Sequence, residues 1–287
     1  MIFFIAIMAS IALELSFRIV DEWRRFGWFA QFTDWVCHRL DSISFSNGPL
    51  MVIAIIAPLL IAVGLVSSIL GAVWGGLDFI FSVLVLTLSL GPVDPIRQAR
   101  DYVKALQSND ADEASLQASK ILGCEVDEEP VLVAEKVKQV LLIKSCSGII
   151  GVFVLFIILG PIGAAMFRLS CLLKDRYADV QTDFAKSVND LYAILMWLPA
   201  RVTVLCFALV GNFVDVVHSL KGISDLWQTD SDELLIETGI GALHECDLSD
   251  TEKVNDEHVY DCLSLVKRAV VAFLTLLGVV VIVSWIV

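Results

Sequence analysis

The chain has 287 residues, 57% of them hydrophobic, and its mean hydropathy of +0.78 is well above that of soluble proteins. Its 33 acidic and 20 basic residues give a net charge of −13, which argues against nucleic acid and against a basic attachment to anionic lipid. Seven scattered cysteines without a CxxC pair do not form a disulfide framework and suit a reducing cytoplasm.

Long uncharged segments indicate a membrane protein. Between Asp41 and Asp94 the only charged residue is Asp78, and residues 42–77 form an uncharged run of 36 residues. About 20 apolar helical residues are enough to cross a bilayer core about 30 Å thick. Further apolar runs cover 145–167, 191–214 and 269–287. We therefore predict an all-α, polytopic helical membrane protein with cytoplasmic helical insertions.

In chain order, the sequence divides into seven predicted segments. An apolar helix begins the chain without the features of a cleavable signal, and an aromatic, arginine-containing stretch typical of a membrane interface follows it. The segments are 1–17 (short N-terminal membrane helix), 18–49 (interfacial segment), 50–90 (membrane helical hairpin with two crossings), 91–144 (cytoplasmic helical hairpin and linking helix), 145–217 (membrane helices), 218–268 (acidic cytoplasmic insertion) and 269–287 (C-terminal membrane helix).

Two local signals refine this division. Asp94-Pro95 is a strong helix start, and Gly123 is a good C-terminal cap, so residues 94–123 are predicted to form a soluble helical hairpin. Gly160-Pro161 predicts a bent or broken helix, because proline removes a backbone donor. The break is compatible with a kinked crossing or with a re-entrant turn.

Lysine and arginine counts predict the orientation. With the N-terminus outside, the segments 18–49, 94–144 and 218–268 face the cytoplasm and carry 15 basic residues. The outer side then has five, which are Arg168, Lys174, Arg176, Lys186 and Arg201. If Gly160-Pro161 forms a re-entrant turn, the loop 168–190 returns to the cytoplasm instead.

Three charged residues in or beside apolar segments are candidates for binding a ligand: Arg201, Asp78 and Glu14. A charge within a membrane is costly unless it is paired or can reach the interface. Arg201 could bind an anionic group, with Asp78, Asp190 or Glu14 as alternative partners. The alternative interpretation is an interfacial anchor held in a structural ion pair.

No catalytic residue, metal site or cofactor is predicted. His258 and Cys262 would share a helical face, but His244 and Cys246 lack a standard zinc spacing. The acidic residues at 247–257 lack the pattern of a calcium loop. The sequence has no nucleophile elbow, phosphate-binding loop or dinucleotide fingerprint.

Several motifs, in order along the chain, resemble the AmpE membrane proteins of Gram-negative bacteria. They are the apolar start ending in Glu14, Ser89-Leu90-Gly91, the run 159–165 (LGPIGAA), the run 197–202 (WLPARV) and the run 207–213 (FALVGNF). The resemblance implies a multi-pass protein of the inner membrane with a non-enzymatic regulatory role, linked to β-lactamase induction and to muropeptide recycling by the amidase AmpD. The implied partners are the lipid bilayer and a cytoplasmic protein or an anionic small ligand.

AmpE is in turn similar to the CobD/CbiB enzymes of cobalamin assembly, which share the Pro-x-Arg segment and a helical hairpin, here beginning at Ala105-Leu106. The enzymes' acidic cluster is replaced here by Ile143-Lys144 and Ser147, and Gly123-Cys124-Glu125 stands in place of Gly-Arg-Asp. The synthase reaction is therefore not expected. Two alternatives are a membrane enzyme acting on a phosphorylated or lipid-linked substrate and, more weakly, a small-solute transporter.

Overall fold

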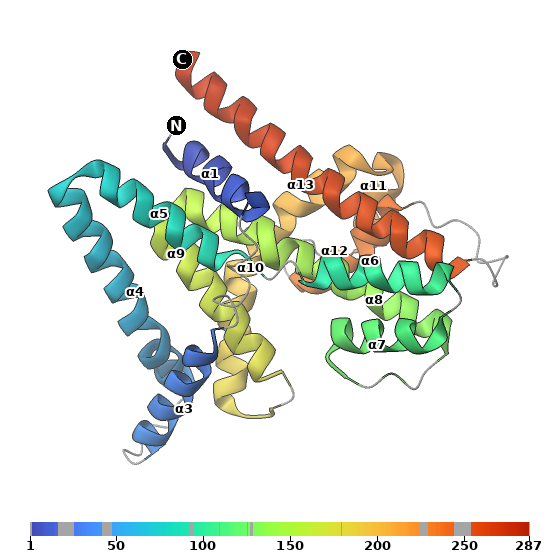
Figure 1. Ribbon diagram of the computed structural model, residues 1–287, viewed down its shortest axis with the longest axis horizontal. Helices are drawn as coiled ribbons and strands as arrows, with labels where there is room; N and C mark the ends of the chain where they lie inside the picture. The colour runs from blue at the N-terminus through green and yellow to red at the C-terminus, as the bar shows by residue number, and fades with distance from the viewer. Residues whose placement is uncertain are drawn as a thin grey trace. The chain divides into compact units, whose positions relative to one another are not determined.

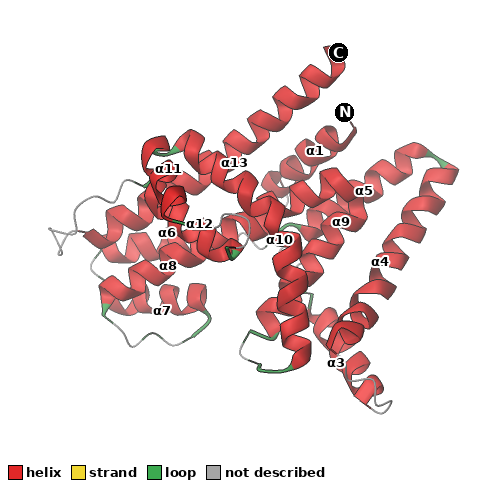
Figure 2. Ribbon diagram, turned by 180° about the vertical axis from the view of Figure 1, so that it is seen from behind, coloured by secondary structure: helices red, strands yellow, loops and turns green. Residues whose placement is uncertain are grey.

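The computed structural model is helical, and the residues that it describes contain no β-strand (Figures 1 and 2). It describes residues 2–16, 26–41, 48–91, 94–108, 110–124, 126, 129–178, 180–223, 229–243 and 254–286. Four helical stretches are long and apolar enough to cross a membrane: Gly48–Val73, Pro130–Arg176, Asp183–Val210 and His258–Val283. The prediction of an all-α, polytopic membrane protein is therefore confirmed.

The chain forms two compact units. The first comprises Met1–Pro92 and Gly151–Pro199, with helices α1 (Ile2–Ser16), α3 (Gly27–Asp41), α4 (Gly48–Val73), α5 (Gly75–Ser89), α9 (Gly151–Arg176) and the first part of α10 (Asp183–Val210). The second comprises Val93–Ile150 and Ala200–Val287, with α6 (Asp94–Gln107), α7 (Ala111–Leu122), α8 (Pro130–Ser145), the π-helical turn η1 (Cys146–Ile150), the end of α10, α11 (Phe213–Gly222), α12 (Ser231–Ala242) and α13 (Val254–Ile286).

In the first unit, α4 and α5 form the predicted membrane hairpin, with the turn at Trp74. α4 has 26 residues and exposes a series of large apolar side chains, as expected for a helix in contact with lipid. α5 has only 15 residues, or roughly 22 Å of helix. It packs against α1 and α9. A straight helix of this length is shorter than a bilayer core, so the two full crossings of this hairpin stay a prediction.

The helix α9 is broken at Gly160, whose backbone has φ 65° and ψ −150°. Only glycine adopts such a conformation readily. After the break, Gly163 lies directly against the carbonyl oxygen of Leu155. Eight residues of continuous helix would separate these positions by about 12 Å. The chain therefore turns sharply at Gly160-Pro161, more sharply than an ordinary proline kink.

One apolar cluster in the first unit joins four helices. Phe29 and Val36 of α3 pack with the start of α4, the end of α9 and the start of α10, which contribute Met51, Val52, Ile55, Ile56, Leu169, Leu173 and Val188. At its edge, Nη2 of Arg176 donates to both carboxylate oxygens of Asp34, at 2.7 and 2.8 Å. The Cys37 thiol lies 3.9 Å from the Tyr177 hydroxyl.

This cluster favours the second of the two placements left open for the loop 168–190. Residues 18–49 and the loop 168–190 were assigned to opposite sides of the membrane, yet α3 contacts both ends of that loop. Groups in direct contact cannot be separated by a core about 30 Å thick. The four bases of 168–190 therefore lie on the same side as residues 18–49, and the count of 15 against five no longer holds.

In the second unit, the charged insertions pack together. α6 and α7 form the predicted helical hairpin, in which Ala105 and Ala114 are buried and small enough for close packing. α6 and α8 pack against α13, and α12 packs against α8. The insertions 94–144 and 218–268 therefore lie on one side of the membrane.

α13 crosses the predicted boundary at residue 268, because one helix of 33 residues runs from the charged part into the apolar part. Arg268, at this junction, donates from Nη1 to the carbonyl oxygen of Val210 at 3.1 Å, where α10 ends. A cation at the last carbonyls of a helix is favourable. The contact places the end of α10 and the charged-to-apolar junction of α13 at the same level.

Asn212 begins α11 directly after α10. Its side-chain oxygen accepts hydrogen bonds from the backbone of Val214 and Asp215, at 3.1 and 3.5 Å. Asn212→Ala should lower the free energy of unfolding by about 1 kcal/mol, because the first turn loses its cap. Chemical unfolding in mixed micelles would measure this. Asn212→Ser should recover most of the loss, and equal losses in both variants would contradict the capping role.

Candidate functional site

Arg201 lies in α10, in the part that belongs to the second unit, and is half-buried. Its predicted partners Asp78, Asp190 and Glu14 belong to the first unit. Pairing between them stays a prediction. Two residues further along α10, the buried hydroxyl of Thr203 donates to Cys146 Sγ at 3.2 Å and so joins α10 to the π-helical turn η1. Such turns occur frequently at functional sites.

Asp78 lies in the first turn of α5 and is partly buried. Its carboxylate accepts a hydrogen bond from Ser67 Oγ of α4 at 2.5 Å, across the hairpin. This contact satisfies one carboxylate oxygen close to the turn at Trp74. Glu14 lies in α1, which packs against α5, but its side chain is outside the described residues.

The contact with Ser67 predicts a structural role for Asp78. Asp78→Asn keeps an acceptor oxygen, so the free energy of unfolding should change by less than about 0.5 kcal/mol, whereas Asp78→Leu should cost about 1 kcal/mol. Unfolding of both variants in mixed micelles tests this. A stable Asp78→Asn variant that no longer functions in cells would instead assign Asp78 to ligand binding.

The candidate metal residues are only partly described. Cys262 is buried in α13, with its thiol 3.9 Å from the carbonyl oxygen of Lys138. His244, Cys246 and the acidic residues at 247–253 lie outside the described residues. Within the described part of the chain, no three His, Cys, Asp or Glu side chains gather in a way that could hold a metal ion.

Two buried bases were not among the predicted site residues. Arg168 is 7% exposed and its guanidinium carbon lies 5.9 Å from the centre of the Phe26 ring. Lys138 is 4% exposed and pairs with Glu135 at 2.9 Å. Lys138 follows Glu135 by three residues, a spacing that predicts a pair. Arg168 instead meets the ring of Phe26, which is far away in the sequence, so no local spacing predicts this contact.

Tyrosines outside the membrane helices remain protonated near neutral pH. Burial raises the pKa of Tyr102 in α6. Burial and, secondarily, the neighbouring Cys37 thiol raise the pKa of Tyr177. These phenols act as structural groups in the packing of their units, and their position offers no base at physiological pH.

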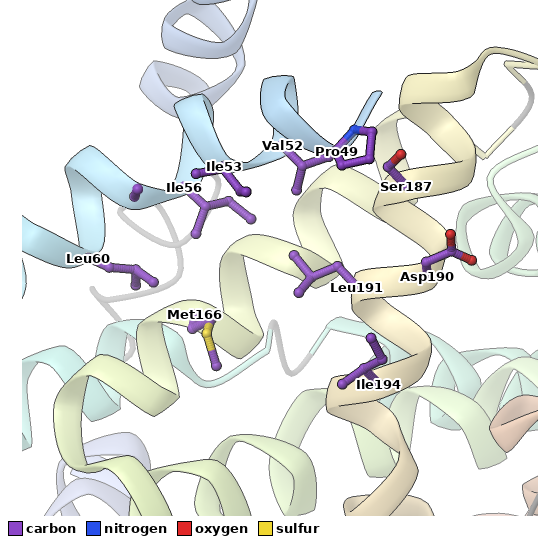
Figure 3. Close-up of a pocket in the computed structure, with 11 residues that line it drawn as sticks. Pro49, Val52, Ile53, Ile56, Leu60, Met166, Ser187, Asp190, Leu191 and Ile194 are labelled. Atoms are coloured by element: carbon purple, nitrogen blue, oxygen red, sulfur yellow. The ribbon is translucent and has the colours of Figure 1, made fainter. Parts of the chain in front are cut away.

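The described residues of the first unit form a groove between α4 and α10, with Met166 of α9 at its base (Figure 3). Its volume is about 430 Å³. Nearly all of its lining is apolar, from Pro49, Val52, Ile53, Ile56, Ala57, Leu60, Met166, Leu191 and Ile194, with Ser187 and Asp190 at one end. The Asp190 carboxylate lies on the side of α10 away from α4 in this view (Figure 3).

The groove is closed at the Ser187 end by a close approach of two helices. Gly48, at the start of α4, lies against the carbonyl oxygen of Asp183 and the hydroxyl of Ser187 at the start of α10. Ser187 Oγ also donates to the Asp183 carbonyl at 2.8 Å. Glycine at residue 48 lets the two helix starts approach closely, and the groove opens away from them. The sequence offered no signal for this site, since it depends on the packing of α4 on α10.

The architecture is that of a polytopic helical membrane protein in which spanning helices alternate with charged helical insertions. A family model described as the regulatory signalling modulator protein AmpE matches residues 1–284. The chain belongs to the AmpE family. No significant match was found to a curated protein or to a solved structure. The predicted resemblance to AmpE is confirmed, and the relation to CobD/CbiB stays a prediction.

Proposed function

We propose that this protein is a non-enzymatic regulator of the bacterial inner membrane that links muropeptide recycling to β-lactamase induction. The observation that carries the proposal is the match of an AmpE family model over nearly the whole chain. Four helices long and apolar enough to span a membrane are consistent with a role at the membrane itself.

The second unit supports the regulatory interpretation. The helical insertions 94–144 and 218–268 pack together through α6, α8, α12 and α13, so they form one surface on one side of the membrane. The second insertion has 12 acidic and four basic residues, which favours a partner with a basic surface. In this mechanism an anionic ligand at Arg201 changes how this surface is presented to a cytoplasmic partner.

The test is a deletion of the gene in a host with inducible β-lactamase, followed by complementation. The deletion should change the induction ratio of β-lactamase and the cytoplasmic pool of muropeptides, and the wild-type chain should restore both. Unchanged induction and an unchanged muropeptide pool in the deletion strain would overturn the proposal.

Arg201→Lys tests the enzymatic alternative. Lysine keeps the charge but not the planar, bidentate geometry of the guanidinium. Full complementation by Arg201→Lys would count against an enzyme that orients a phosphorylated substrate through Arg201. Loss of complementation by Arg201→Lys, with protein levels unchanged, would favour specific recognition of an anionic group.

A further inference from the structure

We propose that the groove between α4 and α10 holds a single acyl chain of a membrane phospholipid. The groove lies between two helices that are long and apolar enough to span the bilayer. Ile53 and Ile194, on its two walls, are 59% and 72% exposed. In a spanning helix such side chains face lipid, so the groove opens toward acyl chains rather than toward water.

The dimensions of the groove fit one chain from one leaflet. Pro49 and Leu60, at its two ends on α4, are 11 residues apart, which corresponds to roughly 16 Å of helix. Half of a hydrocarbon core is about 15 Å. The length of the groove along α4 therefore matches the depth of one leaflet.

The apolar lining of the groove also favours an acyl chain as the ligand. A polar ligand would lose its hydration without gaining hydrogen bonds. The side chains that line the walls are apolar, and Asp190 directs its carboxylate away from α4 (Figure 3). A flexible alkyl chain loses nothing polar on entering and gains van der Waals contacts with Met166 and the side chains of both helices. The headgroup then lies near Ser187 and the closed end of the groove.

Native mass spectrometry of the full chain tests the proposal after extraction from membranes and exchange into phosphatidylethanolamine–phosphatidylglycerol mixed micelles. One phospholipid per chain should survive the collision energy that removes the surrounding lipid. Ala57→Phe and Ile53→Phe place a ring in the groove and should each reduce the retained fraction about fivefold, equivalent to about 1 kcal/mol.

Ile61→Phe is the matched control. Ile61 lies in α4 with 60% exposure but does not line the groove, so this variant should retain lipid as the wild type does. Two groove variants are compared so that the test still holds if one of them misfolds. Retention of lipid by both groove variants, binding of a detergent molecule in place of a phospholipid, or absence of a retained lipid in the wild type would each overturn the proposal.

Discussion

Gly163→Ala is expected to be among the most destabilising single substitutions in the membrane part of this protein. A Cβ at this position would meet the carbonyl oxygen of Leu155 and the Cβ of Leu159, and the carbonyl belongs to backbone that cannot move aside. We expect a loss of about 3 kcal/mol in the free energy of unfolding. Alanine's helix propensity, about 1 kcal/mol better than that of glycine, is too small to compensate.

Chemical unfolding in mixed micelles measures the loss, with Gly75→Ala as the control. Gly75 lies at the start of α5 in the same unit, and among the described residues no atom beyond its chain neighbours and its own helix backbone comes within 4 Å of an alanine Cβ there. The control should be neutral or slightly stabilising. If Gly163→Ala is equally well tolerated, the sharp turn at Gly160 is not the stable arrangement of α9.

Gly211→Ala should have the second large effect. Its Cβ would lie 2.7 Å from both the Cβ and the carbonyl oxygen of Ala242, and 2.9 Å from the carbonyl oxygen of Phe207. The same place holds the hydrogen bond from the Asn212 backbone to the Ala242 carbonyl, at 3.0 Å. We expect a loss of about 2 kcal/mol, because the substitution separates α12 from the junction of α10 and α11.

The measurement is again chemical unfolding, and the control here is Gly222→Ala. Gly222 ends α11 in the second unit, and within the described part of the chain no atom outside its immediate surroundings in α11 lies within 4 Å of a Cβ at that position. A small gain or no change is expected for this control. A Gly211→Ala variant as stable as the control would show that α12 does not pack on this junction.

These two glycines give a physical meaning to the motifs that suggested the family. Gly163 lies in the run that begins at Leu159, and Gly211-Asn212 lies in the run that begins at Phe207. Both glycines permit close backbone approach, and Asn212 caps a helix. The glycines of these motifs are therefore explained by packing within the fold. The role of Arg201 in function stays a prediction.

The membrane character of this protein could be predicted from the sequence because it depends on the length of uncharged runs. An uncharged, largely apolar run of 36 residues such as 42–77 is long enough to span a bilayer, and this property does not depend on the rest of the sequence. The start of α6 at Asp94, the cap at Gly123 and a break at Gly160-Pro161 were also predictable, since capping and proline chemistry act within a few residues.

The orientation could not be predicted from counts of lysine and arginine alone. The counts assigned the loop 168–190 to the side opposite residues 18–49, and the ion pair between Asp34 and Arg176 joins the two. These residues are 142 positions apart. Their contact follows from how α3, α4, α9 and α10 meet, which no local pattern records.

Local patterns thus determined that the chain is a helical membrane protein, where its helices start and break, and which family it resembles. Tertiary packing alone decided that α9 turns back on itself at Gly160, that the two charged insertions share one side, and that α4 and α10 leave an apolar groove. The physical reason is the distance along the chain over which each effect acts, because hydropathy and capping involve residues within a few turns of one helix. A groove or a sharp turn depends instead on contacts between residues that are far apart in the sequence. Gly48 and Ser187 are an example, because they meet only through the packing of α4 against α10.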